Sequence, residues 1–148
     1  MTGEPARRSR QRARNRERGA ARPTIAERFE AADHLLAGTV TDAGGVWSRA
    51  TSWILRLAIE QAVDELWARR EPALARCPMR AQLLALRLHA GSELAARIAA
   101  VWTALSRAAH HHDYELAPSV TELRRWREQA EEFADALAAL PGTAAVRR

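Results

Sequence analysis

The sequence has no lysine, a single cysteine and no long apolar run. Because Cys77 has no second cysteine to pair with, an intrachain disulfide is excluded, and a cysteine-based zinc site has too few ligands. The apolar stretches fall short of the ~18 residues that a transmembrane helix needs, and none follows the N-terminal arginines as it would in a secretory signal. We therefore expect a cytoplasmic protein without a metal, a cofactor or a membrane partner.

All basic side chains are arginines, and they are concentrated at the N-terminus. The 148 residues carry a net charge of +5. Residues 1–23 hold eight arginines and two glutamates, a net charge of +6, and the other 125 residues hold 15 arginines and 16 acids, a net charge of −1. The first segment has too little apolar surface to offset the entropy of ordering. We expect a disordered basic arm over 1–23, a helical bundle over 24–141 and a short tail over 142–148.

Within the arm, arginine recurs at every second position from 10 to 18. In an extended chain this spacing places the guanidinium groups on one side, where they can follow a phosphate backbone and release its counterions. Arginine-rich segments often become ordered on RNA. We predict that RNA, or alternatively DNA, binds here, through Arg7, Arg8, Arg10, Arg12, Arg14, Arg16 and Arg18. A solubilising tail, a membrane-surface contact and an acidic partner protein are the other interpretations.

The first half of the body is expected to contain two helices before the first internal proline. Thr24 and Glu27 match a capping box, which starts a short helix that ends at Gly38. The stretch 46–70 lacks glycine and proline and is apolar around most of its circumference, which predicts a central helix. Glu60 and Asp64, one turn apart on this helix, either orient an arginine or histidine of the segment 107–114 described below or form a solvated face.

The second half of the body is also expected to be helical. Pro78 starts a helix that Gly91 ends, and Ser92 is expected to cap the next one. Ser119 and Glu122 match a second capping box. The helix that follows keeps an apolar heptad spacing, which serves either the core or a partner helix: Leu123, Trp126, Ala130, Phe133, Leu137 and Leu140.

The predicted fold class is all-α, a bundle of four to five helices with the disordered arm described above. No segment offers a convincing strand pattern. The tryptophans are predicted to lie in the core, and three of them occur within apolar helical patterns: Trp53, Trp102 and Trp126.

The segment Arg107 to Tyr114, RAAHHHDY, lies at the end of the helix predicted after Gly91. Consecutive helical residues point about 100° apart, so three adjacent histidines cannot easily share a metal ion. One interpretation is capping, since cationic side chains interact well with the last carbonyls of a helix. The other is chemistry, since histidine moves protons near neutral pH and an arginine fork holds a phosphate.

Arg107, His112 and Tyr114, separated by four residues and then by one, resemble the motif of the HEPN (higher eukaryote and prokaryote nucleotide-binding) domains. These are small helical bundles, and many are metal-independent ribonucleases of toxin–antitoxin and phage-defence systems. The resemblance implies RNA as ligand, a homodimer in which two motifs face each other, an antitoxin protein as partner, and Arg107, His112 and Tyr114 as catalytic residues. The family's active ribonucleases usually have a polar residue where this chain has Ala108. The alternative is a non-catalytic helical module that binds nucleic acid or a partner helix.

Overall fold

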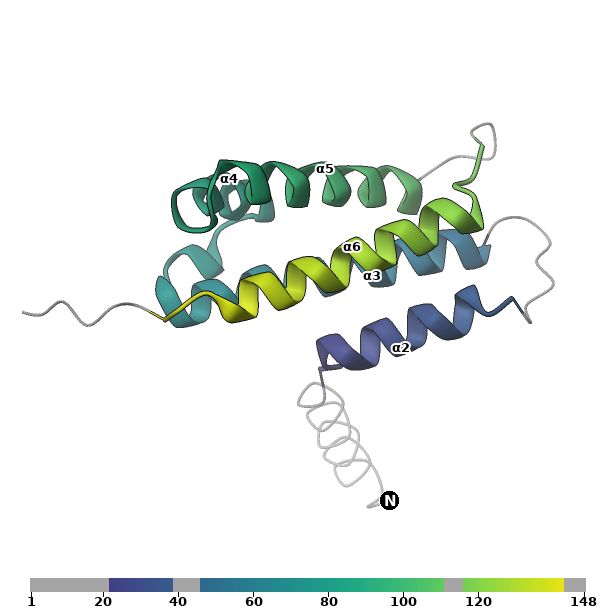
Figure 1. The fold of residues 1–148 in the computed structure, drawn as a ribbon, viewed down its shortest axis with the longest axis horizontal. Coiled ribbons are helices and arrows are strands. Elements are labelled where there is room, and N and C mark those ends of the chain that lie inside the picture. The colour runs from purple at the N-terminus through teal and green to yellow at the C-terminus, as the bar shows by residue number, and fades with distance from the viewer. Residues whose placement is uncertain (1–21, 39–45, 111–115, 143–148) are drawn as a thin grey trace, which may run out of the picture.

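The computed structural model describes residues 22–38, 46–110 and 116–142, and these residues are almost entirely helical (Figure 1). Within them are five α-helices, one short 3₁₀ turn and no strand. The elements are α2 (Ile25–Leu36), α3 (Val46–Arg70), η1 (Leu74–Arg76), α4 (Met79–Ala90), α5 (Ser92–Ala109) and α6 (Val120–Ala139). The all-α prediction is confirmed. In this part of the chain, no helix has the length and apolarity needed to span a bilayer.

Two capping boxes start helices α2 and α6, as the sequence predicted. The Thr24 hydroxyl accepts a hydrogen bond from the backbone N–H of Glu27 at 3.1 Å, and the Glu27 carboxylate accepts one from the backbone N–H of Thr24 at 2.8 Å. Ser119 and Glu122 make the same pair of bonds at the start of α6, at 3.1 and 3.2 Å. Each box satisfies two N–H groups that a helix start otherwise leaves unpaired.

The cap expected at Ser92 is wrong by one position. Gly91 is both the C-cap of α4 and the N-cap of α5, and Ser92 is the first residue of α5. Gly91 has a φ of 84°, a conformation that residues with a Cβ atom rarely adopt. Because one glycine both ends α4 and starts α5, no separate capping residue lies between the two helices.

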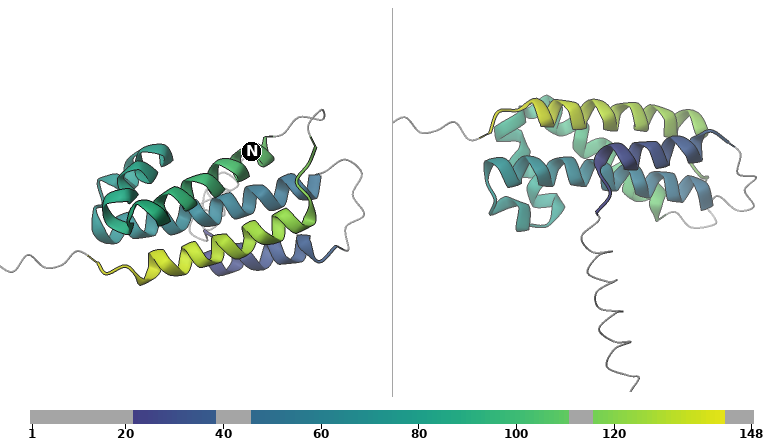
Figure 2. Two further views of the ribbon diagram at one scale, coloured as in Figure 1. Left: turned by 45° about the horizontal axis from the view of Figure 1, so that its top comes forward. Right: turned by 90° about the horizontal axis from the view of Figure 1, so that it is seen from below.

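Helix α3 is the central element of the bundle. It packs against α2, α5 and α6, and α4 packs chiefly against α5. Figure 1 shows α5 and α2 on opposite sides of α3 with α6 lying along it, and Figure 2 shows the same arrangement from two further directions. The prediction that 46–70 forms the central helix is confirmed. Several of its large side chains are almost inaccessible to solvent: Leu55, Ile59, Val63, Leu66 and Trp67.

The heptad face of α6 belongs to the core. Its residues Leu123, Ala130, Phe133 and Leu137 are buried, while Trp126 and Leu140 are partly buried against the bundle. Burying a leucine or phenylalanine side chain contributes about 1.5–3 kcal/mol relative to its exposure. The interpretation of this face as a docking site for a partner helix is therefore wrong, because α3 and its neighbours already cover it.

The tryptophans do not all lie in the core. Trp67 is fully buried and Trp102 and Trp126 are partly buried, but Trp53 is 42% exposed. In this part of α3 the buried positions are taken by small polar residues, among them Thr51 and Ser52, whose hydroxyls donate to carbonyls one turn earlier. Trp53 therefore lies beside the buried stripe and not in it, which corrects the prediction for this residue.

Candidate functional site

Of the residues predicted for chemistry, the described part of the chain contains Arg107. It lies in the last turn of α5, with its side chain exposed. His112 and Tyr114 lie outside the described residues, and so do the predicted arginines of the arm: Arg7, Arg8, Arg10, Arg12, Arg14, Arg16 and Arg18.

Arg107 lines a groove of about 900 Å³ between α4 and α5. Arg80 and Arg87 of α4 and His110 at the end of α5 also line it. None of the described residues that form its walls is acidic. The rest of the lining is mostly apolar or small: Leu83, Leu84, Ala95, Ala96, Ala99, Trp102, Thr103 and Ser106. The groove thus combines cationic groups with an apolar floor.

The side chains of the three groove arginines make no hydrogen bond or ion pair with another described residue. Each guanidinium therefore keeps its five N–H donors available to a ligand or to water. Arg49, Arg76 and Arg125 are also unpaired among the described residues, but they do not line this groove. Three unpaired cations around one apolar floor, with no described acidic neighbour in its lining, form a site suited to a polyanion.

Arginines elsewhere on the bundle are held by partners. The Arg127 Nε and Nη2 atoms each donate to the Asp33 carboxylate at 2.8 Å, and the guanidinium lies 4.9 Å from the centre of the Phe29 ring. Arg127 also pairs with Glu131. The hydrogen bonds to Asp33 raise the pKa of Arg127. This arginine joins α2 to α6 and is committed to the fold.

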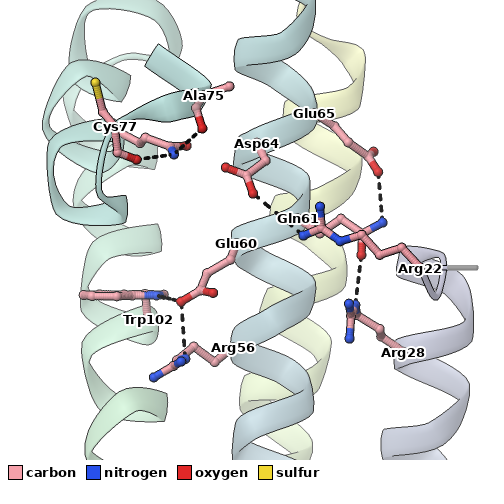
Figure 3. Close-up of polar contacts among 11 residues, drawn as sticks. Arg22, Arg28, Arg56, Glu60, Gln61, Asp64, Glu65, Ala75, Cys77 and Trp102 are labelled. Carbon is pink, nitrogen blue, oxygen red and sulfur yellow. Dashed lines mark hydrogen bonds and ion pairs between the residues drawn. The ribbon is translucent and has the colours of Figure 1, made fainter. Parts of the chain in front are cut away.

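A chain of polar contacts connects the centre of α3 to the groove (Figure 3). The Trp102 indole N–H donates to Glu60 Oε1 at 3.0 Å, and the same oxygen lies 3.3 Å from Arg56 Nε. The Arg56 and Glu60 side chains are only 16% and 20% exposed. The solvated-face interpretation is therefore wrong for Glu60, which holds Arg56 in place. Asp64 points away from this chain toward Arg22, with 3.8 Å between the charged atoms.

Arg56 in turn contacts two side chains at the end of the groove. Its guanidinium carbon lies 4.5 Å from the centre of the Trp53 ring, and its Nη1 lies 3.5 Å from His110 Nε2. A guanidinium can only donate, so His110 Nε2 is the acceptor where this contact is a hydrogen bond. The edge-on contact between Trp53 and His110, with ring centres 6.1 Å apart, completes the cluster.

Sequence reasoning missed several residues of this site. Arg80 and Arg87 are two helical turns apart on α4, a spacing that places both on one face and that could have been recognised. Arg56 and Glu60 form an i, i+4 pair of opposite charges on α3, which was a second available signal. The position of His110 depends on a contact with a residue 54 positions earlier, for which the sequence carries no local signal.

No group of three histidine, cysteine, aspartate or glutamate side chains with metal-binding geometry occurs in the described ranges. Cys77 is a free, partly exposed thiol outside the groove. No protein-family model, curated protein or solved structure matches the chain. The interpretation of the groove therefore depends on its own geometry and chemistry.

Proposed function

We propose that this protein binds RNA in the α4–α5 groove in the manner of a HEPN domain, and that the arm adds affinity that is independent of sequence. The observation that carries the proposal is the set of three arginines, Arg80, Arg87 and Arg107, that line one groove without a partner among the described residues. Guanidinium groups bind phosphate oxygens in pairs, and phosphate contacts supply most of the nonspecific affinity for nucleic acid.

The spacing of these arginines suits an extended polyanion. Arg80 and Arg87 are seven residues apart on α4, a separation of about 10.5 Å along the helix axis. They can therefore contact different phosphates of one strand, and Arg107 on α5 adds a third contact. Charge complementarity supports this assignment, because the described lining offers no carboxylate that would repel a phosphate.

Cleavage through the HEPN-like motif is the catalytic form of this proposal. In it His112 accepts the proton of a ribose 2′-hydroxyl while that oxygen attacks the adjacent phosphorus, and the bond to the 5′-oxygen breaks as that oxygen takes a proton from water. Arg107 stabilises the charge that grows on the phosphate oxygens, and Tyr114 orients the histidine. Two motifs facing each other in a homodimer complete the site, and an antitoxin protein is the partner that blocks it.

Binding without cleavage is the second candidate function. The position after Arg107 favours it, because Ala108 is only 7% exposed and offers no polar group to the substrate. The protein then acts as a helical RNA-binding module. Partner binding through the heptad face of α6 is not part of this candidate, because that face is buried.

The test is an RNA-binding and RNA-cleavage assay of the full chain with EDTA present. Arg107→Ala is expected to weaken RNA binding about tenfold and to leave the helical circular-dichroism signal unchanged. Arg125→Ala is the matched control, because it removes an unpaired arginine of α6 outside the groove. Equal RNA affinity of Arg107→Ala and the parent would refute the proposal.

The cleavage assay distinguishes the catalytic form of the proposal from the non-catalytic one. RNA cut by the parent in EDTA, and left intact by both Arg107→Ala and His112→Ala, supports the catalytic form. Tight binding of RNA that stays intact supports the non-catalytic module.

A further inference from the structure

Trp53 is the one exposed aromatic side chain in the part of the chain that the structure describes. The other described tryptophans and both phenylalanines are buried or partly buried. An exposed indole leaves a large apolar surface in water. The part of this ring that Arg56 and His110 do not cover is open to a ligand.

The ring of Trp53 is held in a fixed orientation. The Arg56 guanidinium lies 4.5 Å from the ring centre, and His110 packs edge-on against the ring at an interplanar angle of 83°. Arg56 is itself fixed by Glu60, which accepts the Trp102 indole N–H. The ring is thus positioned before any ligand arrives, so a ligand that stacks on it does not have to order it.

Trp53 also lies next to the basic groove. His110, which contacts its ring, lines the groove together with Arg107. Trp102, at the other end of the polar chain, forms part of the groove floor. An RNA strand whose phosphates contact the groove arginines can therefore place a neighbouring base on the ring of Trp53.

We infer that Trp53 is a stacking platform for an unpaired base, and that the groove selects single-stranded RNA. The inference rests on the proposed RNA binding and adds the form of RNA. Bases stack on aromatic side chains in proteins that bind single strands, whereas the bases of a duplex are stacked on each other and their faces are closed. The apolar floor of the groove likewise suits bases and offers nothing to a duplex, which presents its phosphates.

The experiment compares full-chain variants on two labelled RNA probes. One probe is a ten-residue oligouridine, and the other is a blunt-ended RNA duplex of ten base pairs without a loop. Trp53→Ala is expected to weaken oligouridine binding roughly 5- to 150-fold and to leave duplex binding unchanged. Trp53→Phe keeps an aromatic face and is expected to recover most of the affinity. Circular dichroism of both variants verifies that the bundle is folded.

The outcomes separate this inference from the proposed function. If Trp53→Ala binds oligouridine as the parent does while Arg107→Ala binds weakly, the stacking platform is refuted and the groove remains. If Arg107→Ala also binds as the parent does, the proposed function is refuted. A third outcome is that Trp53→Ala binds oligouridine as the parent does but elutes at a different volume in size-exclusion chromatography. This result would assign the ring to a protein interface and overturn the inference.

Discussion

Two groups of arginines differ in their surroundings. Those between α2 and α6 are bound to other side chains or carbonyls, whereas those of the α4–α5 groove have no partner among the described residues. Arg127 donates two hydrogen bonds to Asp33, pairs with Glu131 and stacks on Phe29. Arg107 makes none of these contacts with a described residue. In a chain without lysine, arginine must supply both the ion pairs of the fold and the cations that meet a ligand. What distinguishes the groove is therefore not the number of arginines but the gathering of three unpaired arginines in one lining, and we propose that this surface binds RNA.

Paired arginines connect the short helix α2 to its neighbours. This helix has 12 residues and buries only Phe29, Ala32 and Leu36. Arg127 fastens it to α6 through Asp33, and the Arg28 Nε donates to Gln61 of α3 at 2.9 Å. Burial lowers the pKa of Arg28, and Arg22 adds to this effect. Two guanidinium groups thus tie α2 to α6 and to α3.

Deletion of residues 1–21 has the largest expected effect on RNA binding. The deletion removes seven arginines, so the slope of log affinity against log salt concentration is expected to fall by roughly five for a single strand. The preference for single strands over duplex should remain, because we assign it to the groove. A fluorescence-anisotropy salt titration measures both quantities. Loss of the preference along with the arm would show that the groove does not bind RNA.

Arg127→Ala is expected to lower the free energy of unfolding by about 2 kcal/mol, since it removes a bidentate, partly buried pair and a ring contact. Its RNA affinity should not change. Urea denaturation measures the first quantity. Arg107→Ala is the matched control, with an expected change within about 0.5 kcal/mol. Equal stability of the two variants would contradict the division between fold arginines and groove arginines.

Glu60→Gln is expected to have the smallest effect, and to act on both regions. The amide oxygen still accepts the Trp102 N–H, but Arg56 loses its carboxylate partner, which lowers stability by about 1 kcal/mol. Because Arg56 orients Trp53, oligouridine affinity should fall a few-fold, as measured by anisotropy. Asp64→Asn, one turn further along α3, is the control and should change neither quantity measurably, because its 3.8 Å pair with Arg22 is exposed. An equal effect of the two variants on RNA binding would contradict a positioning role for Glu60.

The sequence predicts those parts of the fold that local patterns determine. Thr24 with Glu27 and Ser119 with Glu122 are spaced to cap their own helices, and both capping boxes are confirmed. The helix 46–70 follows from an uninterrupted apolar pattern, and its bounds are confirmed. These features require no knowledge of what lies beside them.

The candidate site could not be predicted in the same way, because it depends on contacts between distant residues. Arg127 meets Asp33 across 94 positions and His110 meets Arg56 across 54, so the sequence does not reveal which arginines are paired. Trp53 and Trp67 occur on the same apolar helix, yet one is exposed and the other buried, because the neighbouring helices cover only one of them. Of the three predicted catalytic residues, Arg107 lines the groove, and His112 and Tyr114 stay predictions.

The central claim, that the unpaired groove arginines bind RNA, is tested most directly by the salt dependence of oligouridine affinity in two triple variants of the full chain. One replaces Arg80, Arg87 and Arg107 by alanine, and the other replaces Arg49, Arg76 and Arg125, which are equally unpaired among the described residues but lie outside the groove. Both variants lose three positive charges. We predict that the slope of log affinity against log salt falls by about two in the groove variant and stays at the parent value in the control. Equal slopes in the two variants would contradict the claim.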